Sequence, residues 1–180
     1  PIFTFINKMD RPGRDPLSLL DEIESELKLV TLPINWPIGS GDQFRGVVDR
    51  INEEVILFDK AKRGAQSQEK RISLNDKNLT NYIEQELLNN TLEELELLDE
   101  AGAKYEKDKV FRGDLTPVFF GSAMTNFGVR PFLDSFLNLA KKPSSRSSNQ
   151  GDIEPTKNKF SGFVFKLQAN MDPKHRDRVA

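Results

Sequence analysis

The chain opens with an apolar run, followed by a polar loop and an amphipathic segment. Residues 1–7 are nearly all apolar and β-prone, which is typical of a strand buried on both faces of a parallel sheet. After the loop, Asp15 and Pro16 have the chemistry of a helix N-cap and first turn. Apolar side chains then recur at helical spacing, at Leu17, Leu20, Ile23 and Leu27. This opening predicts a strand, a loop and a helix, which is half of a βαβ unit.

The same order returns later in the chain. Residues 116–120 form a second short apolar run, and the small residues of Gly121-Ser122-Ala123 end it in a turn. Residues 129–139 then return to a helical pattern. Two strand–loop–helix units predict an α/β fold with a parallel sheet.

The segment between these two units, roughly residues 33–110, is predicted to be an inserted α+β subdomain. Residues 47–58 predict a β-hairpin with its turn near Asn52. Residues 59–78 are polar and predict a loop. About residues 78–104 return to helix, and the acidic residues there are most simply a solvated face.

The composition changes after the second helix. Residues 142–158 are rich in Ser, Pro, Asn and Lys, which predicts a linker. Residues 160–168 then alternate between apolar and polar side chains, as in the first strand of a β-domain. We therefore expect a first domain over residues 1–141, the linker, and the start of a second domain over residues 159–180.

Composition excludes several kinds of chemistry. The 180 residues contain no Cys and a single His, His175, so disulfides, thiolate zinc sites and multi-His metal sites are excluded. No apolar run approaches the roughly 18 residues that a membrane-spanning helix needs. The formal net charge of -2 leaves contacts with nucleic acid open, because the 26 Lys and Arg residues can still cluster.

Polar residues of a particular kind follow the first predicted strand. Asn7, Lys8 and Asp10 lie where ligands bind in open α/β sheets, beyond the carboxyl end of a strand. A carboxylate such as that of Asp10 can accept two parallel hydrogen bonds from the N1–H and N2–H₂ edge of guanine, whereas adenine offers no such pair. Each bond to the charged group contributes about 1.5–3 kcal/mol, so such a site can reject the wrong base. The Lys8 stem can lie along the base, and Asn7 can bridge the loop or reach a ring nitrogen.

The turn after the second strand offers a complement to this loop. Its side chains are small, so the backbone N–H groups of Gly121, Ser122 and Ala123 can approach a carbonyl oxygen such as guanine O6. On its own, the loop after the first strand could be no more than a polar entry to a helix. The presence of both turns in one half-sheet favours a base-binding site.

Several strings of residues resemble a known family. Asn7-Lys8-Met9-Asp10 with the later Ser122-Ala123 turn resembles the two guanine-specificity motifs of GTPases. With an insertion between them, the arrangement is similar to the translational GTPases of the elongation factor G type. The string from Phe3 to Arg11 and the long string from Phe163 to Arg178 resemble the family of bacterial peptide chain release factor 3.

The resemblance implies a fold and an activity. The fold would be α/β: the C-terminal part of a P-loop NTPase-type G domain with three layers, an inserted α+β subdomain, and the first strand or strands of a β-barrel domain. The activity would be GTP hydrolysis by a cytoplasmic protein that binds the ribosome, both its RNA and its proteins, during translation termination. The protein would promote the release of class-I peptide release factors, with neither membrane nor DNA as a partner.

The resemblance also assigns residues. Asn7, Lys8 and Asp10 would contact the guanine of GTP or GDP, and Ser122 and Ala123 would complete the base pocket. The sequence contains no G-x-x-x-x-G-K-[ST] phosphate loop, and the family's Mg²⁺-binding and water-positioning residues cannot be identified in it. Because phosphoryl transfer depends on those parts, we expect a fragment that is not catalytic alone and holds no metal itself. Mg²⁺ would be bound through residues outside these 180.

Two alternatives stay open. One is an elongation factor G-like translocation GTPase, against which the string from Lys166 to Arg178 argues. The other is a non-catalytic interaction module in which residues 7–10 are only a helix-entry loop.

Overall fold

The computed structural model describes residues 1–58, 69–101, 104–149, 151–169 and 178–179. The chain divides into two compact units, Pro1–Lys141 and Lys142–Ala180, which we describe separately. Within the described residues, no helix has the length and apolar composition that crossing a bilayer requires.

The first unit contains a three-stranded parallel sheet. Its strands, in spatial order, are β1 (Thr4–Ile6), β7 (Leu115–Phe120) and β2 (Val30–Pro33). Ile6 of β1 pairs with Phe120 of β7, so the two strands end side by side at the same edge. The predicted strands at both positions are confirmed. All six residues of β7 are buried, whereas the three residues of β1 are only half-buried, so the expected burial of the first strand on both faces is wrong.

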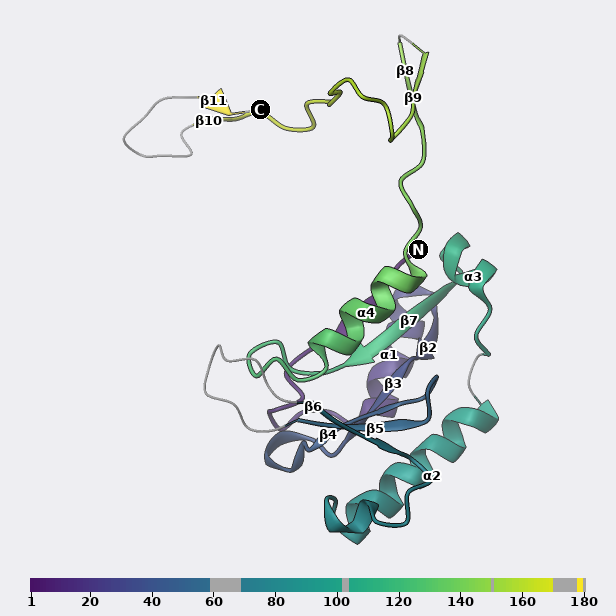
Figure 1. The fold of residues 1–180 in the computed structure, drawn as a ribbon, viewed down its shortest axis with the longest axis vertical. Helices are drawn as coiled ribbons and strands as arrows, with labels where there is room; N and C mark the ends of the chain where they lie inside the picture. The colour runs from purple at the N-terminus through teal and green to yellow at the C-terminus, as the bar shows by residue number, and fades with distance from the viewer. Residues whose placement is uncertain (59–68, 102–103, 150, 170–177, 180) are drawn as a thin grey trace. The chain divides into compact units, whose positions relative to one another are not determined.

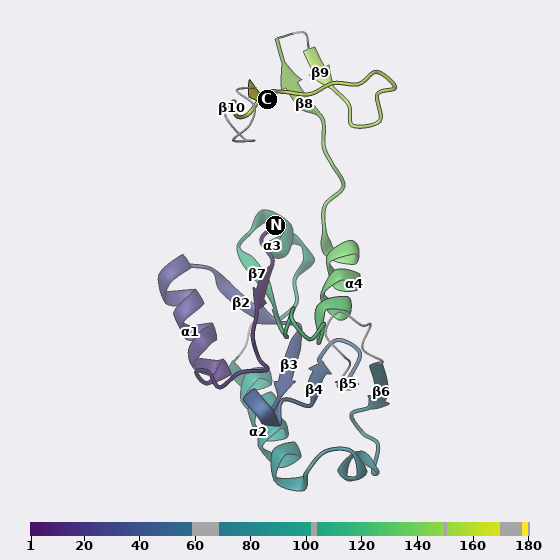
Figure 2. The same cartoon turned by 90° about the vertical axis from the view of Figure 1, so that its left-hand side faces the viewer.

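Two helices cover opposite faces of this sheet, as Figures 1 and 2 show. Helix α1 (Pro16–Leu27) begins as predicted, with the Asp15 carboxylate accepting a hydrogen bond from the Ser18 N–H at 2.9 Å. Helix α4 (Val129–Leu139) has the predicted bounds. Its Phe132 ring packs against Phe5 and Phe119, with ring centroids 5.2 and 5.1 Å apart. The result is a three-layer α/β arrangement, as the sequence predicted.

The insertion is built on a four-stranded antiparallel sheet. Its strands, in spatial order, are β3 (Asn35–Ile38), β4 (Gly46–Asp49), β5 (Glu54–Phe58) and β6 (Glu69–Ser73). Helix α2 (Gln85–Ala101) supplies Leu88, Leu95 and Leu98 to the same core as Trp36 and Val48 of the sheet. The 3-10 turns Gly41–Gln43 and Leu79–Asn81 and the short helix α3 (Lys107–Arg112) complete the unit. The predicted hairpin is confirmed as β4–β5.

Several elements of this unit differ from the expectation. Strand β6 lies in the segment predicted as a loop. It is an edge strand in which Ile72 alone is buried, so its sequence shows little apolar alternation. The remainder of that predicted loop, residues 59–68, falls outside the described residues. Helix α2 begins at Gln85 rather than near residue 78, because a 3-10 turn precedes it. Strands β2 and β3 and helix α3 were not predicted.

The second unit contains two short hairpins. Strand β8 (Arg146–Ser148) pairs with β9 (Gly151–Ile153), and β10 (Gln168–Ala169) pairs with β11 (Arg178–Val179), both antiparallel. The first hairpin lies within the predicted linker. Of the strand predicted over residues 160–168, only Gln168 lies in a strand, as the first residue of β10, and the apolar side chains of the segment are exposed. An alternating segment needs a covered face and paired backbone, and the described residues supply neither to residues 160–167. His175 falls outside the described residues.

Candidate functional site

Two loops meet at the carboxyl edge of the parallel sheet. Residues 7–10 follow β1 and residues 121–123 follow β7. The Gly121 N–H donates to the Ile6 carbonyl at 3.0 Å, and the Met9 N–H donates to the Gly121 carbonyl at 3.1 Å. The structure thereby brings together the segments that carry all five predicted site residues, at the edge where open α/β sheets bind ligands.

Asn7 joins the two loops through its side chain. Its Oδ1 accepts hydrogen bonds from the Lys8 N–H at 2.8 Å and from the Ala123 N–H at 2.9 Å. The second bond spans 116 residues of sequence. Of the two roles that the sequence allowed for Asn7, the structure shows the bridging one.

Lys8 is exposed and has a left-handed backbone, with φ 71°. Its carbonyl accepts a hydrogen bond from the Arg11 N–H at 3.0 Å, which closes a tight turn over residues 8–11. A non-glycine residue in this region costs of order 1–3 kcal/mol, and such residues cluster at functional sites. The Lys8 side chain therefore stands in solvent at a strained turn.

Asp10 has a carboxylate oxygen without a partner. Its Oδ1 is buried and accepts no hydrogen bond from the protein, which among the described residues is true of no other buried side-chain oxygen or nitrogen. Leaving such an acceptor unpaired costs about 1–3 kcal/mol or more. The residue as a whole is only partly buried. A ligand with N–H donors would satisfy this oxygen.

The turn after β7 is held closed by its own backbone. Ser122 and Phe127 exchange two N–H to carbonyl bonds, of 2.8 and 3.0 Å, and Ser122 is fully buried. Gly121 is required by close packing, because a Cβ there would collide with the Phe127 carbonyl and lie 2.9 Å from the Phe5 ring.

This turn departs from the expectation in one respect. The three N–H groups that the sequence offered to guanine O6, those of Gly121, Ser122 and Ala123, already donate to Ile6, Phe127 and Asn7. The turn therefore shapes the site through its backbone geometry and its contact with Asn7.

The insertion contacts both loops. The Gly41 N–H donates to the Met9 carbonyl at 2.8 Å. The Phe127 ring stacks on Phe58 of β5, with centroids 4.9 Å apart, and lies 6.1 Å from Phe44. Sequence reasoning did not identify Gly41 or Phe44 as part of this region, because nothing local to them signals a contact so distant in sequence.

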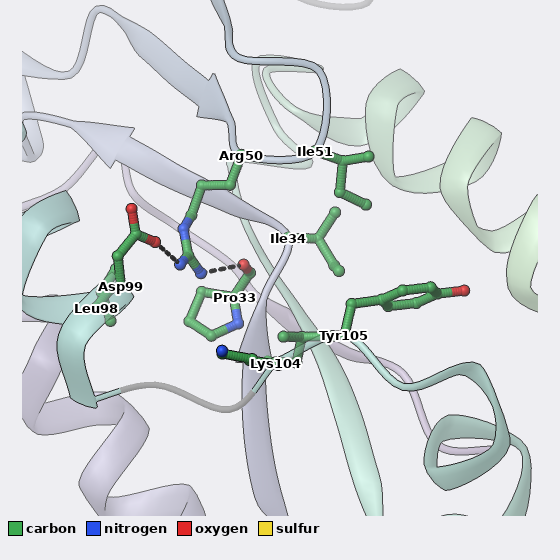
Figure 3. Close-up of a pocket in the computed structure, with 9 residues that line it drawn as sticks. Pro33, Ile34, Arg50, Ile51, Leu98, Asp99, Lys104 and Tyr105 are labelled. Carbon is green, nitrogen blue, oxygen red and sulfur yellow. Dashed lines mark hydrogen bonds and ion pairs between the residues drawn. The ribbon is translucent and has the colours of Figure 1, made fainter.

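A separate pocket of about 330 Å³ lies where the insertion meets strand β2 (Figure 3). Arg50 crosses it, and its guanidinium donates to the Pro33 carbonyl at 2.7 Å and pairs with Asp99 at 2.6 Å. None of the five predicted site residues lines it. Arg50 thus links the insertion to β2, with both of its bonds made to other residues of this chain. The pocket is separate from the two loops.

The described residues contain no group of three or more His, Asp or Glu side chains that could hold a metal ion. Among the described carboxylates, a clear pKa shift is found for Glu94 of α2, whose Oε2 accepts a hydrogen bond from the Trp36 Nε1–H at 2.6 Å. Burial raises the pKa of Glu94 and the nearby charge of Asp15 raises it further, while the Trp36 bond opposes the rise.

Comparison with known proteins places the chain among GTP-binding domains. Residues 1–142 match the family described as elongation factor Tu GTP binding domain. The whole chain is 58% identical to peptide chain release factor 3 of Microcystis aeruginosa (strain NIES-843) and 57% identical to that of Gloeothece citriformis (strain PCC 7424). These alignments cover 33% and 34% of the two relatives, so the chain spans about a third of their length.

The fold also resembles a solved structure, the crystal structure of ttk003000868 from Thermus thermophilus. The TM-score is 0.53 at 23% identity, over 80% of this chain and 23% of that one. At this identity the likeness concerns the fold alone.

Proposed function

Because the chain belongs to the family of elongation factor Tu GTP binding domains, we propose that it is the guanine-recognising part of a translational GTPase that acts in translation termination. The observation that carries the base-binding role is the unpartnered Asp10 oxygen, placed beside two cross-linked loops at the carboxyl edge of the sheet. The termination role is supported by relatives named peptide chain release factor 3, which align with the whole chain at 56–58% identity.

Each predicted residue has a role in this proposal. Asp10 accepts the N1–H and N2–H₂ of guanine, which gives its buried oxygen the partner that the protein does not supply. The Lys8 stem covers one face of the base, since its side chain is exposed beside the loop. Asn7, Ser122 and Ala123 hold the two loops at a fixed separation through the bond from Ala123 to Asn7.

The phosphates and Mg²⁺ of the nucleotide would be bound by residues outside this chain. When bound, Mg²⁺ would neutralise charge on the phosphates during hydrolysis. We accordingly expect the 180 residues alone to hydrolyse no GTP and to bind it too weakly to detect by calorimetry. The longer protein would hydrolyse GTP in the cytoplasm and bind ribosomal RNA and proteins. It would promote the dissociation of class-I release factors, with no role for membrane or DNA.

The base-binding proposal is tested with Asp10→Asn. A suitable host is the Microcystis aeruginosa relative with its matching segment replaced by these 180 residues, since 58% identity over the whole segment favours a folded graft. Asn cannot accept both guanine N–H groups, but its amide can accept from N1–H and donate to O2 of xanthine. We expect GDP affinity to fall by roughly a hundredfold or more, since two bonds to a charged group are lost, and xanthosine diphosphate affinity to rise.

The control for this experiment is Asp15→Asn. It removes the same charge five positions along the chain, and Asn caps a helix about as well as Asp. GDP affinity should be unchanged in this variant. The base-pocket assignment is wrong if Asp10→Asn and Asp15→Asn bind GDP and xanthosine diphosphate alike in isothermal titration calorimetry.

The termination role has its own test. Ribosomes stalled after peptide release with a fluorescent class-I release factor are mixed with the graft and GTP, and dissociation is followed in a stopped-flow instrument. We expect faster dissociation with GTP than without nucleotide. An unchanged rate, together with acceleration of messenger RNA movement on pre-translocation ribosomes, would instead support the elongation factor G-like alternative.

A further inference from the structure

Asn35 lies where the inserted sheet meets the parallel sheet, and it is 2% exposed. Strand β2 pairs with β7 as far as Pro33 opposite Val118, and the Ile34 N–H donates to the Val118 carbonyl at 2.9 Å. The main chain then departs into β3. From this point the side chain of Asn35 takes the place of a neighbouring strand.

The Asn35 amide pairs with both backbone groups of Phe120. Its Nδ2–H donates to the Phe120 carbonyl at 3.1 Å, and its Oδ1 accepts from the Phe120 N–H at 2.7 Å. Both bonds are buried and span 85 residues of sequence. Buried backbone groups are almost always paired, so loss of this amide leaves the last residue of β7 without partners on that side.

Phe120 is the residue directly before the turn that shapes the site. Gly121 follows it and is bonded to Ile6 and Met9, and Ala123 is bonded to Asn7. A shift of Phe120 therefore moves both loops, because they are joined to one another through these bonds.

Strand β3, which carries Asn35, also contacts the ring of Phe120. Trp36, the residue after Asn35, lies 5.1 Å from the Phe120 ring, edge to face, and its Nε1–H is fixed by Glu94 of α2. The insertion thus contacts Phe120 through its backbone by Asn35 and through its ring by Trp36. These contacts give Asn35 a defined orientation as well as a buried position.

We propose that Asn35 is a positioning residue for guanine recognition, which acts by fixing the end of β7 and hence the relative placement of the two base-binding loops. Through Asn35 the inserted subdomain becomes part of the base site without touching the base. The inference rests on the proposed base-binding function, and its test separates the two.

The test variant is Asn35→Asp, which keeps the size of the side chain and the acceptor for the Phe120 N–H. It replaces the donor to the Phe120 carbonyl with a carboxylate oxygen, so two negative atoms face each other. In the grafted protein we expect GDP affinity to fall about tenfold at pH 8. Protonation of the new carboxyl restores a donor, so the loss relative to wild type at the same pH should shrink as the pH is lowered towards 5.

The matched control is Ile72→Ala, which removes a buried side chain from the far edge strand of the same inserted sheet. It destabilises the insertion without touching Phe120. We expect its GDP affinity to stay within about twofold of wild type, with no dependence of the difference on pH. A second variant, Asn35→Thr, retains one hydroxyl that can bond to Phe120, and we expect an affinity loss of about threefold.

A nucleotide-free readout completes the design. In ¹⁵N spectra of the 180-residue chain, Asn35→Asp should shift the amide signals of Phe120, Gly121 and Ala123 and speed their hydrogen exchange, whereas Ile72→Ala should not.

If the Asn35 variants bind GDP like wild type while Asp10→Asn does not, the inference is overturned and the base pocket stands. If Asp10→Asn also binds like wild type, the proposed function fails, and the amide shifts alone decide whether Asn35 positions the turn. Should Asn35→Asp not fold, wild-type affinity in Asn35→Thr overturns the inference.

Discussion

Gly121→Ala is the sharpest test of how the turn after β7 is packed. The backbone at Gly121 has no left-handed φ, so alanine fits its conformation, and the substitution adds a single methyl group. That methyl would collide with the Phe127 carbonyl and lie 2.9 Å from the Phe5 ring, and one of these obstacles is backbone held by two hydrogen bonds to Ser122. The turn must therefore move, or the strand before it must.

The magnitude follows from overpacking in a closed region. Insertion of extra carbon into a well-packed site costs typically about 1–3 kcal/mol, and the rigid Phe127 carbonyl favours the upper part of that range. The matched control is Gly13→Ala, where the nearest atom to an added Cβ is the Arg11 carbonyl oxygen at 3.9 Å. There alanine reduces the freedom of the unfolded chain and is expected to be neutral or to stabilise by up to about 1 kcal/mol.

Urea denaturation of the 180-residue chain gives both values. The single tryptophan, Trp36, is fully buried and reports unfolding of the first unit by its fluorescence. We expect the midpoint to fall for Gly121→Ala and to stay or rise for Gly13→Ala, with equal slopes. Equal midpoints for the two variants would refute the packing described for this turn.

Two further predictions concern Glu94 of α2 and the N-cap of α1. Burial and Asp15 raise the pKa of Glu94 above 4.5, so the folded state binds this proton more tightly than the unfolded state. The stability that this proton contributes is complete below the unfolded pKa and is lost as the pH rises through the folded pKa. As the pH rises from 4 to 7, the urea midpoint of wild type should therefore fall relative to that of Glu94→Gln. Midpoints that change with pH in parallel for the two proteins would contradict the raised pKa of Glu94. Asp15→Ala removes the acceptor for the Ser18 N–H and should lower the free energy of unfolding by about 1 kcal/mol. Asp15→Asn keeps an acceptor and should lower it little. Equal losses in the two variants would show that the cap bond is not the cause.

Local signals account for the elements that the sequence predicted well. Asp15 and Pro16 mark the start of α1 because capping is a contact over three residues, and β7 is a continuous apolar run because both of its faces are buried. The turns of the candidate site could be found because each directly follows an apolar run that forms a strand, β1 or β7. These are features in which the residues that cause the structure are neighbours in sequence.

The elements that were missed depend on distant partners. Strand β6 carries Glu69, Lys70 and Arg71 and shows little apolar alternation, since an edge strand in contact with solvent can be polar. Strand β3 contains Pro37, which disfavours a central strand and is tolerated at the edge of a sheet. The strand expected over residues 160–168 had the right alternation, but alternation alone does not supply a paired neighbour.

The same distinction explains why the candidate site could be located but not completed from sequence. Asp10 and Asn7 were identifiable by chemistry and position, whereas Asn35, Gly41 and Phe58 act on the loops across contacts that no local pattern encodes. All three come from the segment inserted between the two loops of the candidate site. If the insertion made no contact with those loops, the parallel sheet alone would support them. Here it supplies a backbone bond to the first loop, a side-chain pair to the end of β7 and a ring contact beyond the second turn, so the geometry of the site depends on the insertion being folded.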